Sequence, residues 1–530
     1  MKVLRRTDVK EMPDRREKKE NQKQKMTKQN KLIIAFFCII KLTLHLIADY
    51  HSGFQGDELL HIETGKHLAF GYMEFPPLIG VLAFIQNIFN SNSLYIHHLF
   101  SHISCILIII YVAKITIELG GKNKALFLTL LCIIIAPAFG RTQQLFQPVV
   151  FGQLFWILGF YQLVRYTKYR DQKYLTYLTF FALIGFLFKY DILFFILGLS
   201  SLFFFKRTRE TILKHNIVLH IAIALLIVSP NIYWQYANNF PVLQMFNRLY
   251  ETQLDKISRI DNLKNLILAA NPISLILIFP ALFYMFKSNK AELYKPLAFS
   301  ITLSFLLLIF SNGKSYYFFP IILTILPFGA IFWEQKVIQN HKWVMFPVTF
   351  LLFLGSIIIS FGMPVYTFNH YLNSIYKYEK KDIIGGKYGV KYDEYYTQEK
   401  WKITMSELKK VFDSLPKNEK QNCKIWGKHY AQAGAVNLFG KEYNLPKAFS
   451  YHGSYYSWTS SGEMPNTVIA LSYQVGDFFN PYFKKVTLLK SIYNPYADNE
   501  EELYQRIYIC KNPKQNFEKM KDLFKHRIFE

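Results

Sequence analysis

The feature that most constrains this chain is a series of long apolar segments between residues 32 and 361. Crossing a bilayer takes roughly 20 helical residues, and each segment reaches that length alone or together with its polar flanks. The sequence therefore predicts about eleven membrane-spanning helices. They are expected at residues 32–49, 94–113, 125–139, 148–164, 174–188, 192–205, 216–233, 266–286, 296–310, 316–333 and 343–361.

The composition excludes several other kinds of protein. Of the 530 residues, 51% are hydrophobic and 19% are charged, whereas soluble proteins carry about a quarter charged residues. This balance excludes a disordered chain and a simple soluble enzyme, and five cysteines are too few for a disulfide scaffold. The sequence predicts a mainly α, polytopic membrane protein with a soluble domain attached.

The distribution of positive charge predicts the orientation in the membrane. Residues 1–31 contain twelve Lys and Arg against five Asp and Glu, which is typical of a disordered tail. Further Lys and Arg gather in alternate loops, so the net charge of +25 indicates topology and not nucleic-acid binding. We expect a cytoplasmic tail, a transmembrane part at residues 32–364, and a location in the inner membrane.

Residues 365–530 are expected to form a soluble extracytoplasmic domain, because an odd number of spans places them on the outer side. The apolar runs at residues 467–471 and 504–510 predict strands, and the stretch at 430–436 predicts a helix, so an α/β domain is expected. Within the first outer loop, residues 50–93, the run at 78–89 is too short to span and predicts an interfacial or re-entrant helix.

The first outer loop contains an acidic pair, Asp57 and Glu58, directly after Gly56. A carboxylate at a membrane surface is partly desolvated, which raises its pKa and makes it a better base for a hydroxyl acceptor. Alternatively, both residues cap the N-terminus of an interfacial helix, where acidic side chains are favoured. His61 lies one helical turn later, so Asp57, Glu58 and His61 are weak candidates for divalent metal ligands. An interfacial histidine without a metal is the alternative.

Several polar residues lie at the predicted outer ends of other spans. Lys189, Lys314 and Arg141 each place a cation near this boundary, where a cation stabilises a phosphate leaving group. Alternatively, these side chains only reach toward lipid headgroups. Aromatic and amide side chains nearby are candidates for substrate binding, with an aromatic belt as the alternative. They are Tyr72, Tyr190, Asn231, Gln235, Tyr316 and Tyr317.

The order of these motifs resembles a known family. Residues 56–59 (Gly-Asp-Glu-Leu), 71–72 (Gly-Tyr) and 76–78 (Pro-Pro-Leu) are similar to the first-loop pattern of bacterial glycosyltransferases related to the protein O-mannosyltransferases. Relatives include the lipid A aminoarabinose transferase, and all belong to the GT-C superfamily. The similarity continues through further motifs along nearly the whole chain. These are residues 188–190, 230–235, 312–317, 429–435 and 445–446.

The resemblance implies a GT-C-like membrane enzyme that takes a sugar from a polyprenyl-phosphate donor. It implies transfer to a lipid, glycan or protein acceptor on the outer side, with Asp57 as general base. Glu58 is then a neighbour that orients Asp57 or helps to bind a metal, and Lys189 and Lys314 are candidates for the donor phosphate. The chain departs from the family at residues 59–61 (Leu-Leu-His), where relatives often carry an aromatic residue.

Two other classes of function compete with this enzyme. A transporter or flippase of a lipid-linked glycan intermediate places ionisable groups near the middle of the membrane, but here only Lys41, His45 and few others do so. A non-catalytic scaffold accounts for the outer domain but gives the first-loop motif no role. No nucleotide-binding glycine loop is present, as expected for a lipid-linked donor.

Overall fold

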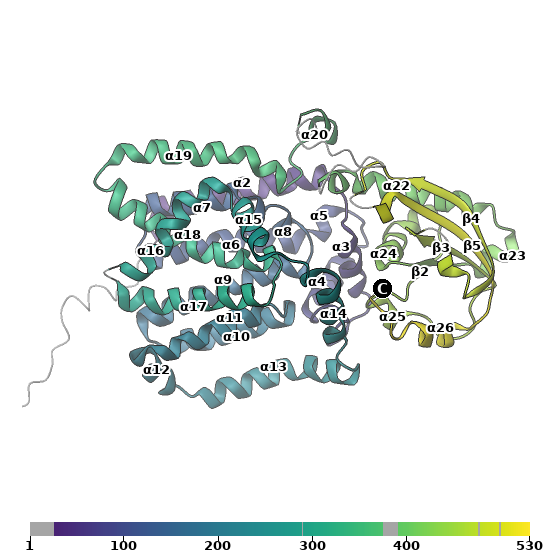
Figure 1. Cartoon of the computed structure of the whole chain (residues 1–530), viewed down its shortest axis with the longest axis horizontal. Coiled ribbons are helices and arrows are strands. Elements are labelled where there is room, and N and C mark those ends of the chain that lie inside the picture. Colours follow the sequence, from purple (N-terminus) through teal and green to yellow (C-terminus); the bar gives the residue numbers. More distant parts are fainter. Residues whose placement is uncertain (1–25, 289, 375–390, 475–476, 498–499, 530) are drawn as a thin grey trace, which may run out of the picture.

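The structure is a computed structural model, and it describes residues 26–288, 290–374, 391–474, 477–497 and 500–529. A bundle of helices forms one part of the molecule and a small α/β domain at the C-terminus forms the other (Figure 1). This arrangement confirms the predicted fold class, a mainly helical chain with a C-terminal α/β domain.

Long apolar helices dominate the bundle. Among the described residues, six helices are long and apolar enough to cross a membrane, and two bent pairs raise the number to eight. Four of the six lie in α2 (Lys28–Tyr50), α6 (Leu99–Glu118), α13 (Ile217–Ala237) and α17 (Ala291–Phe310). The other two are longer helical stretches, Ser315–Ile338 around α18 (Phe319–Phe332) and Lys342–Ser360 around α19 (Met345–Leu354). The bent pairs are α7 (Asn123–Ile135) with the helical segment Pro137–Gln144, and α15 (Arg259–Ala269) with the segment that contains α16 (Leu275–Lys287).

Every predicted segment falls on helical residues. The segments outside the eight spans correspond to α9 (Pro148–Tyr169), α10 (Gln172–Phe188), and α11 (Ile192–Gly198) with η2 (Leu199–Phe204). These helices run alongside α17 and α6 in the same bundle (Figure 1). They are shorter or carry more polar residues than the six long spans, so the count of eleven stays a prediction.

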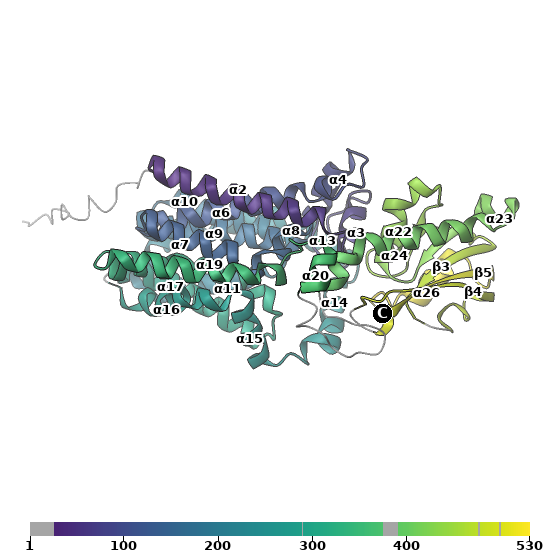
Figure 2. The same ribbon diagram turned by 90° about the horizontal axis from the view of Figure 1, so that it is seen from above.

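The predicted N-terminal tail lies outside the described residues as far as residue 25. Helix α2 begins at Lys28, capped by the side chain of Thr27, so the last residues of the predicted tail are helical. This end of α2 lies far from the C-terminal domain, whereas its other end lies next to that domain (Figure 2).

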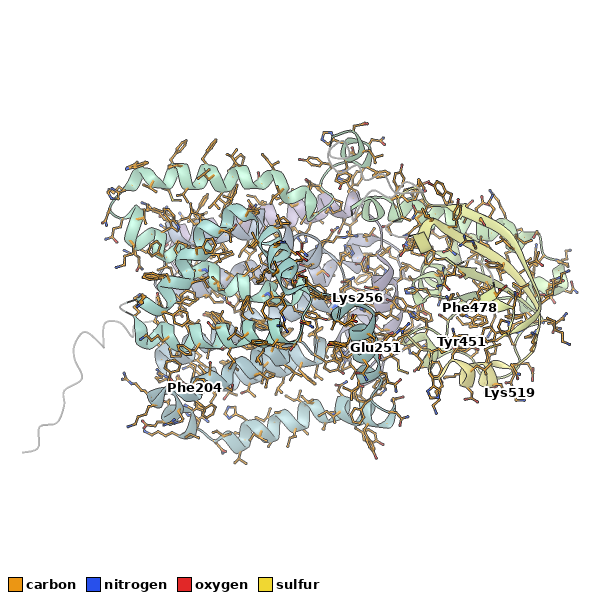
Figure 3. All side chains as sticks on the ribbon, in the orientation of Figure 1. Phe204, Glu251, Lys256, Tyr451, Phe478 and Lys519 are labelled. Carbon is orange, nitrogen blue, oxygen red and sulfur yellow. The ribbon has the colours of Figure 1, made fainter. Side chains whose placement is uncertain are left out.

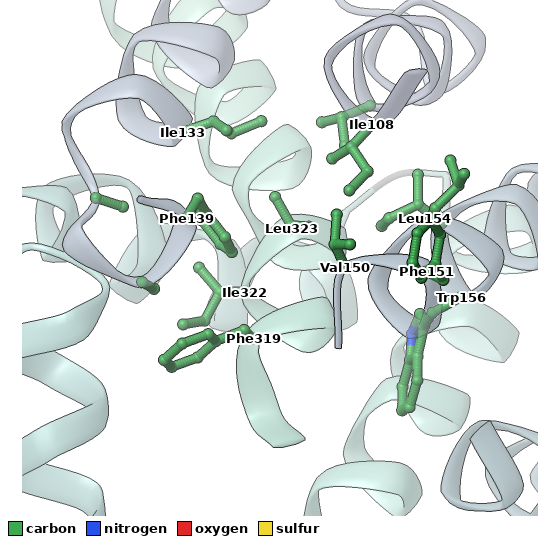
Figure 4. Close-up of a cluster of buried hydrophobic side chains, with 14 of the residues drawn as sticks. Ile108, Ile133, Phe139, Val150, Phe151, Leu154, Trp156, Phe319, Ile322 and Leu323 are labelled. Atoms are coloured by element: carbon green, nitrogen blue, oxygen red, sulfur yellow. The ribbon is translucent and has the colours of Figure 1, made fainter. Parts of the chain in front are cut away.

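Apolar side chains surround α18 in the interior of the bundle. Ile108 from α6, Ile133 from α7, Val150 from α9 and Leu323 from α18 are buried and meet in one cluster (Figure 4). The outer surface is apolar as well: Phe204, at the end of η2, is 75% exposed (Figure 3). A bundle that is apolar both inside and outside is typical of a protein surrounded by lipid.

The C-terminal domain contains a five-stranded sheet in the order β2-β1-β3-β5-β4. Strand β3 (Thr467–Ser472) is buried throughout, parallel to β1 and antiparallel to β5. The two predicted strands are confirmed as β3 and β5, and the predicted helix as α24 (Tyr430–Phe439). β5 extends over Tyr504–Pro513, and the other three strands are β1 (Lys424–Gly427), β2 (Ala448–Phe449) and β4 (Phe483–Tyr493).

Three short helices connect α2 to α6 at the junction between bundle and domain: α3 (Gly56–Thr64), α4 (Leu78–Asn87) and α5 (Leu94–His97). Helix α4 has ten residues, too few to span, in agreement with the predicted interfacial or re-entrant helix. Helix α24 packs on α3 so closely that a Cβ atom at Gly434 would lie 2.8 Å from the Cβ atom of Leu59. The domain is thereby fixed against the first outer loop.

The remaining helices of the described chain are short or belong to the rim and the domain. They are α8 (Arg141–Gln144), α12 (Lys206–Leu213), α14 (Pro241–Leu249), α20 (Phe368–Ser374), α22 (Lys391–Asp413), α23 (Lys417–Asn422), α25 (Tyr455–Trp458) and α26 (Phe517–Phe524).

Candidate active site

A cavity of about 680 Å³ opens between the first outer loop, the bundle and the C-terminal domain. Its walls come from α3, α11 and α14, the turns before α11 and α18, and the start of α24. Seven of the residues predicted from the sequence line it: Asp57, His61, Lys189, Tyr190, Lys314, Tyr316 and Tyr317. The structure therefore brings together groups that are up to 260 residues apart, from 57 to 317.

Asp57 stands in the first turn of α3, and its carboxylate faces the cavity. The phenol of Tyr430, at the start of α24, donates a hydrogen bond of 2.6 Å to Asp57 Oδ1. Burial, together with the nearby Asp57 charge, raises the pKa of Tyr430 far above its ordinary value, so the phenol stays protonated and remains a donor. The C-terminal domain thus holds one oxygen of Asp57, while the other faces the cavity.

Glu58 points away from the cavity and is fully buried. Its Oε1 lies 2.7 Å from His98 Nε2 and accepts from the backbone N–H of Phe146, and its Oε2 accepts from the N–H of Gln55. Burial raises the pKa of Glu58, but His98, Arg141 and the Gln55 N–H together lower it by more, so the net shift is downward. Glu58 therefore completes a capping box at the start of α3, which is the helix-cap alternative considered for the pair.

The two predicted lysines of the cavity differ in their surroundings. Lys189 pairs with Asp191, and its Nζ lies 4.3 Å from the centroid of the Tyr317 ring. Lys314 pairs with no carboxylate in the described part of the chain. Burial lowers the pKa of Lys314, partly offset by the charge of Asp57. Lys314 is thus the cation of the cavity that is available to an incoming anion.

A second carboxyl group, that of Glu74, also lines the cavity. It accepts from the backbone N–H of Ser454 at 2.8 Å and from the Ser454 hydroxyl, both in the C-terminal domain. Burial raises the pKa of Glu74 to about 7, although these hydrogen bonds oppose the shift. Glu74 therefore changes its charge near neutral pH.

Three predicted substrate-binding residues lie behind the cavity wall. Asn231 Oδ1 accepts from the Tyr190 hydroxyl at 3.1 Å, and Gln235 Nε2 donates to the same hydroxyl at 3.2 Å. Both amides are buried and fix the orientation of Tyr190, which does line the cavity. Tyr72 donates to the carbonyl of Thr64 and lines a neighbouring cavity instead.

Arg141 also lies outside the cavity, although it was predicted to bind the donor phosphate. Its side chain is buried beneath the first outer loop, where it donates to Gln144 Oε1 at 3.0 Å and to Ser52 Oγ at 3.4 Å. The structure places this cation in the packing between α2 and α8.

The side of the cavity opposite the carboxylates is apolar. Leu193, Phe194 and Leu197 from α11 face Phe246 and Leu249 from α14. Leu193 is 42% exposed and Leu197 is 52% exposed, so this wall continues onto the outer surface of the bundle. The cavity therefore joins a charged end to an apolar opening.

The predicted metal candidates do not converge on one point. His61 Nδ1 lies 3.1 Å from the carbonyl oxygen of Phe146, and the Glu58 oxygens already have the partners described above. Within the described ranges, a different group of potential ligands converges: Asp49, His98 and His102.

Two residues of the site, Glu74 and Tyr430, were not predicted from the sequence. Tyr430 belongs to the 429–435 motif, and Glu74 lies between the Gly-Tyr and Pro-Pro-Leu motifs of the first outer loop. The packing of α24 on α3 brings Tyr430 to Asp57, while Ser454 of the same domain bonds to Glu74.

Comparison with known proteins agrees with this geometry. The sequence profile of the dolichyl-phosphate-mannose-protein mannosyltransferases matches residues 76–234. The structure superposes on ArnT from Cupriavidus metallidurans, solved bound to undecaprenyl phosphate, with a TM-score of 0.56 and 12% identity, covering 90% of this chain and 97% of ArnT. This chain has the ArnT fold. No curated protein sequence matches the chain.

The two matches confirm the resemblance to GT-C glycosyltransferases predicted from the sequence. The matched profile includes α9 to α12 and most of α13, and thus Lys189 and Tyr190 of the cavity. Asp57 and Lys314 lie outside the profile match. With its apolar helices, the chain is a multi-pass membrane protein and a glycosyltransferase by class.

Proposed function

We propose that this protein transfers a sugar from a polyprenyl-phosphate donor to an acceptor hydroxyl at the outer face of the inner membrane, with Asp57 as general base. The observation that supports it most is the cavity, which is lined by the Asp57 carboxylate, by a lysine without a carboxylate partner among the described residues, and by an apolar opening. ArnT, which has the same fold, was solved with undecaprenyl phosphate, a lipid of this class.

The donor fits the cavity by its chemistry. Its phosphate needs a cation, and Lys314 has no carboxylate partner among the described residues. Its polyprenyl chain needs an apolar surface open to lipid, and Leu193 and Leu197 provide one. Lys189 is already neutralised by Asp191, so it contributes less to binding a new anion than Lys314 does.

The reaction needs only one base and one stabilised leaving group. The acceptor oxygen attacks the anomeric carbon, the bond from that carbon to the phosphate oxygen breaks, and Asp57 takes the proton from the acceptor. Lys314 neutralises the charge that develops on the departing phosphate. Tyr430 holds Oδ1 of Asp57, so Oδ2 is the oxygen left to accept the proton. The catalytic contribution is therefore orientation and charge stabilisation.

The orientation of the chain is part of the proposal. The beginning of α2 and the C-terminal domain lie at opposite ends of the bundle (Figure 2). With the basic tail in the cytoplasm, the cavity and the C-terminal domain face the periplasm. Single cysteines at positions 57 and 460 should then react with a membrane-impermeant reagent from outside.

Substitution of the two lysines tests the donor assignment. We expect Lys314→Ala to reduce transfer about 10- to 100-fold, the cost of losing a charge-assisted contact to a phosphate. Lys189→Ala should have a smaller effect, because Asp191 already pairs with that cation. Transfer is measured by mass analysis of surface glycans and lipids in a deletion strain that carries each variant. An equal loss for both variants would contradict Lys314 as the main phosphate contact.

A further inference from the structure

Two neighbouring helices, α2 and α6, carry four potential metal ligands close to α3. On α2, His45 and Asp49 are four residues apart, and His98 and His102 have the same spacing at the start of α6. Residues four apart share one face of a helix. Helix α2 packs on α6, so the two pairs face each other across the contact.

Three of these side chains already meet. Asp49 Oδ1 lies 2.8 Å from His98 Nδ1, and Asp49 Oδ2 lies 2.7 Å from His102 Nε2. The ligand atoms of Asp49, His98 and His102 all lie within 4.8 Å of one another, and all three residues are buried. A carboxylate between two imidazoles is a set that divalent transition metals prefer.

The fourth side chain, His45, has no hydrogen-bond partner for either ring nitrogen among the described residues, and it is completely buried. Its ring centroid lies 5.6 Å from that of His102. A buried polar group without a partner costs free energy, so an unpaired imidazole beside this cluster calls for an explanation. A metal ion held by the cluster would give His45 a partner, because one of its ring nitrogens could then coordinate the ion.

The surroundings of the cluster resemble those of known metal sites. A metal-bound histidine usually donates its second ring N–H to a carboxylate, which fixes the ring. His98 Nε2 lies 2.7 Å from Glu58 Oε1 in that arrangement, leaving Nδ1 for a metal. Gln144 Nε2 donates to Asp49 Oδ1 at 2.6 Å and orients this carboxylate.

We propose that His45, Asp49, His98 and His102 bind one divalent transition metal ion, with Zn²⁺ as the best match. Three imidazoles and one carboxylate complete a tetrahedral zinc site. The site is buried and provides four protein ligands, so it has no open position for a substrate and is structural. To coordinate the ion, His98 Nδ1 and His102 Nε2 must lose the protons that they share with Asp49. Zn²⁺ binding therefore weakens as the pH falls.

A bound ion would tie α2 to α6 and, through Glu58, to the first turn of α3. Asp57 belongs to the same turn but faces the cavity. The metal therefore acts on the reaction only by positioning. This inference does not depend on the proposed function, because metal content is measured without any transfer assay.

The test measures zinc in the full-length chain purified in detergent. We expect about one zinc ion per chain by mass spectrometry. A strong chelator should remove the zinc and lower the thermal stability, and one equivalent of Zn²⁺ should restore both. His45→Ala and His102→Ala should lose this binding. His97→Gln is the matched control and should keep it, because His97 bonds to the carbonyl of Ser91 and lies outside the cluster.

A milder variant keeps the test informative if ligand variants fail to fold. Glu58→Gln should retain zinc but weaken its affinity about 10- to 100-fold in a competition titration, since it replaces the carboxylate partner of His98 and leaves all four proposed ligands in place. A wild-type chain that takes up no stoichiometric Zn²⁺ after loading would overturn the proposal. So would a folded His45→Ala chain with wild-type zinc affinity.

Discussion

The two faces of α3 carry neighbouring carboxylates with opposite surroundings. Asp57 faces a cavity, and within the described part of the chain the Tyr430 phenol is the one hydrogen-bond donor to its carboxylate. Glu58 faces the bundle, where both its oxygens are engaged by His98, Phe146 and Gln55. Successive residues of an α-helix point about 100° apart, so the side chains of Asp57 and Glu58 lie on different sides of α3 and cannot have the same function.

A general base needs a carboxylate oxygen that is free to take up the proton. Among the described residues, Asp57 keeps such an oxygen, whereas both oxygens of Glu58 have hydrogen-bond partners. Glu58 instead links the first outer loop to the buried histidines of α6. We therefore expect Asp57, on the cavity face of α3, to contribute to catalysis, and Glu58, on the bundle face, to contribute to stability.

Replacing the base should have the largest effect on transfer. Asp57→Asn preserves the side-chain shape but removes the proton acceptor, so we expect transfer to fall about 10²- to 10⁴-fold. The melting temperature should stay close to that of the wild type. Transfer is measured on membranes by mass analysis of the acceptor fraction. Full transfer by a folded Asp57→Asn chain would remove Asp57 as the base.

The matched change on the bundle face should act on stability. Glu58→Gln removes one of the two carboxylates that pair with the buried His98 and leaves Asp49 as the other, which costs about 2 kcal/mol for a weakened buried contact. We expect a lower melting temperature in detergent, with transfer per folded molecule much less affected than in Asp57→Asn. The comparison between the two faces fails if Glu58→Gln abolishes transfer while stability is unchanged.

Loss of the Tyr430 phenol should have a smaller effect. Tyr430→Phe removes one hydrogen bond to Asp57, for which we expect about a five- to tenfold loss of transfer. Transfer is measured on membranes that contain equal amounts of each folded chain. Tyr451→Phe, in the core of the same domain, is the control and should leave transfer unchanged. Wild-type transfer by a folded Tyr430→Phe chain would indicate a purely structural contact.

Glu74 should cause the smallest effect, a dependence of stability on pH. Its pKa is raised from 4.5 to about 7 in the folded chain, so the folded state holds the proton more tightly than the unfolded state. The resulting stabilisation is complete below pH 4.5 and is lost as the pH rises through 7. Wild-type stability should therefore decline from pH 5 to pH 8 more steeply than that of Glu74→Gln. Parallel melting curves for the two chains would argue against a buried, titrating Glu74.

Much of the fold follows from the sequence because a bilayer demands long apolar helices. Each predicted segment is helical, and the runs at 467–471 and 504–510 are strands. The number of spans is harder to predict. Pro137 breaks the helix after α7, and α15 meets α16 at an angle of 90°, so a continuous apolar run does not guarantee one straight helix.

The candidate site was only partly predictable. Asp57, Lys189 and Lys314 were identified by their place at the ends of spans, and they line one cavity. Arg141 and Glu58 also lie at the predicted ends of spans, but their side chains point into the protein. The direction of these side chains depends on how α8 and α3 pack. The four-residue spacing of His45 with Asp49 and of His98 with His102 is present in the sequence, but only the packing of α2 on α6 brings the pairs together.

The exposed leucines of α11 have a consequence for how the protein would work in a cell. A donor could slide sideways out of the lipid layer, past Leu193 and Leu197, and reach the lysine without its tail ever touching water. Turnover would then follow the surface density of the carrier lipid within the leaflet. Competition among all proteins that draw on the same carrier pool would set the rate as much as the residues around Asp57 do.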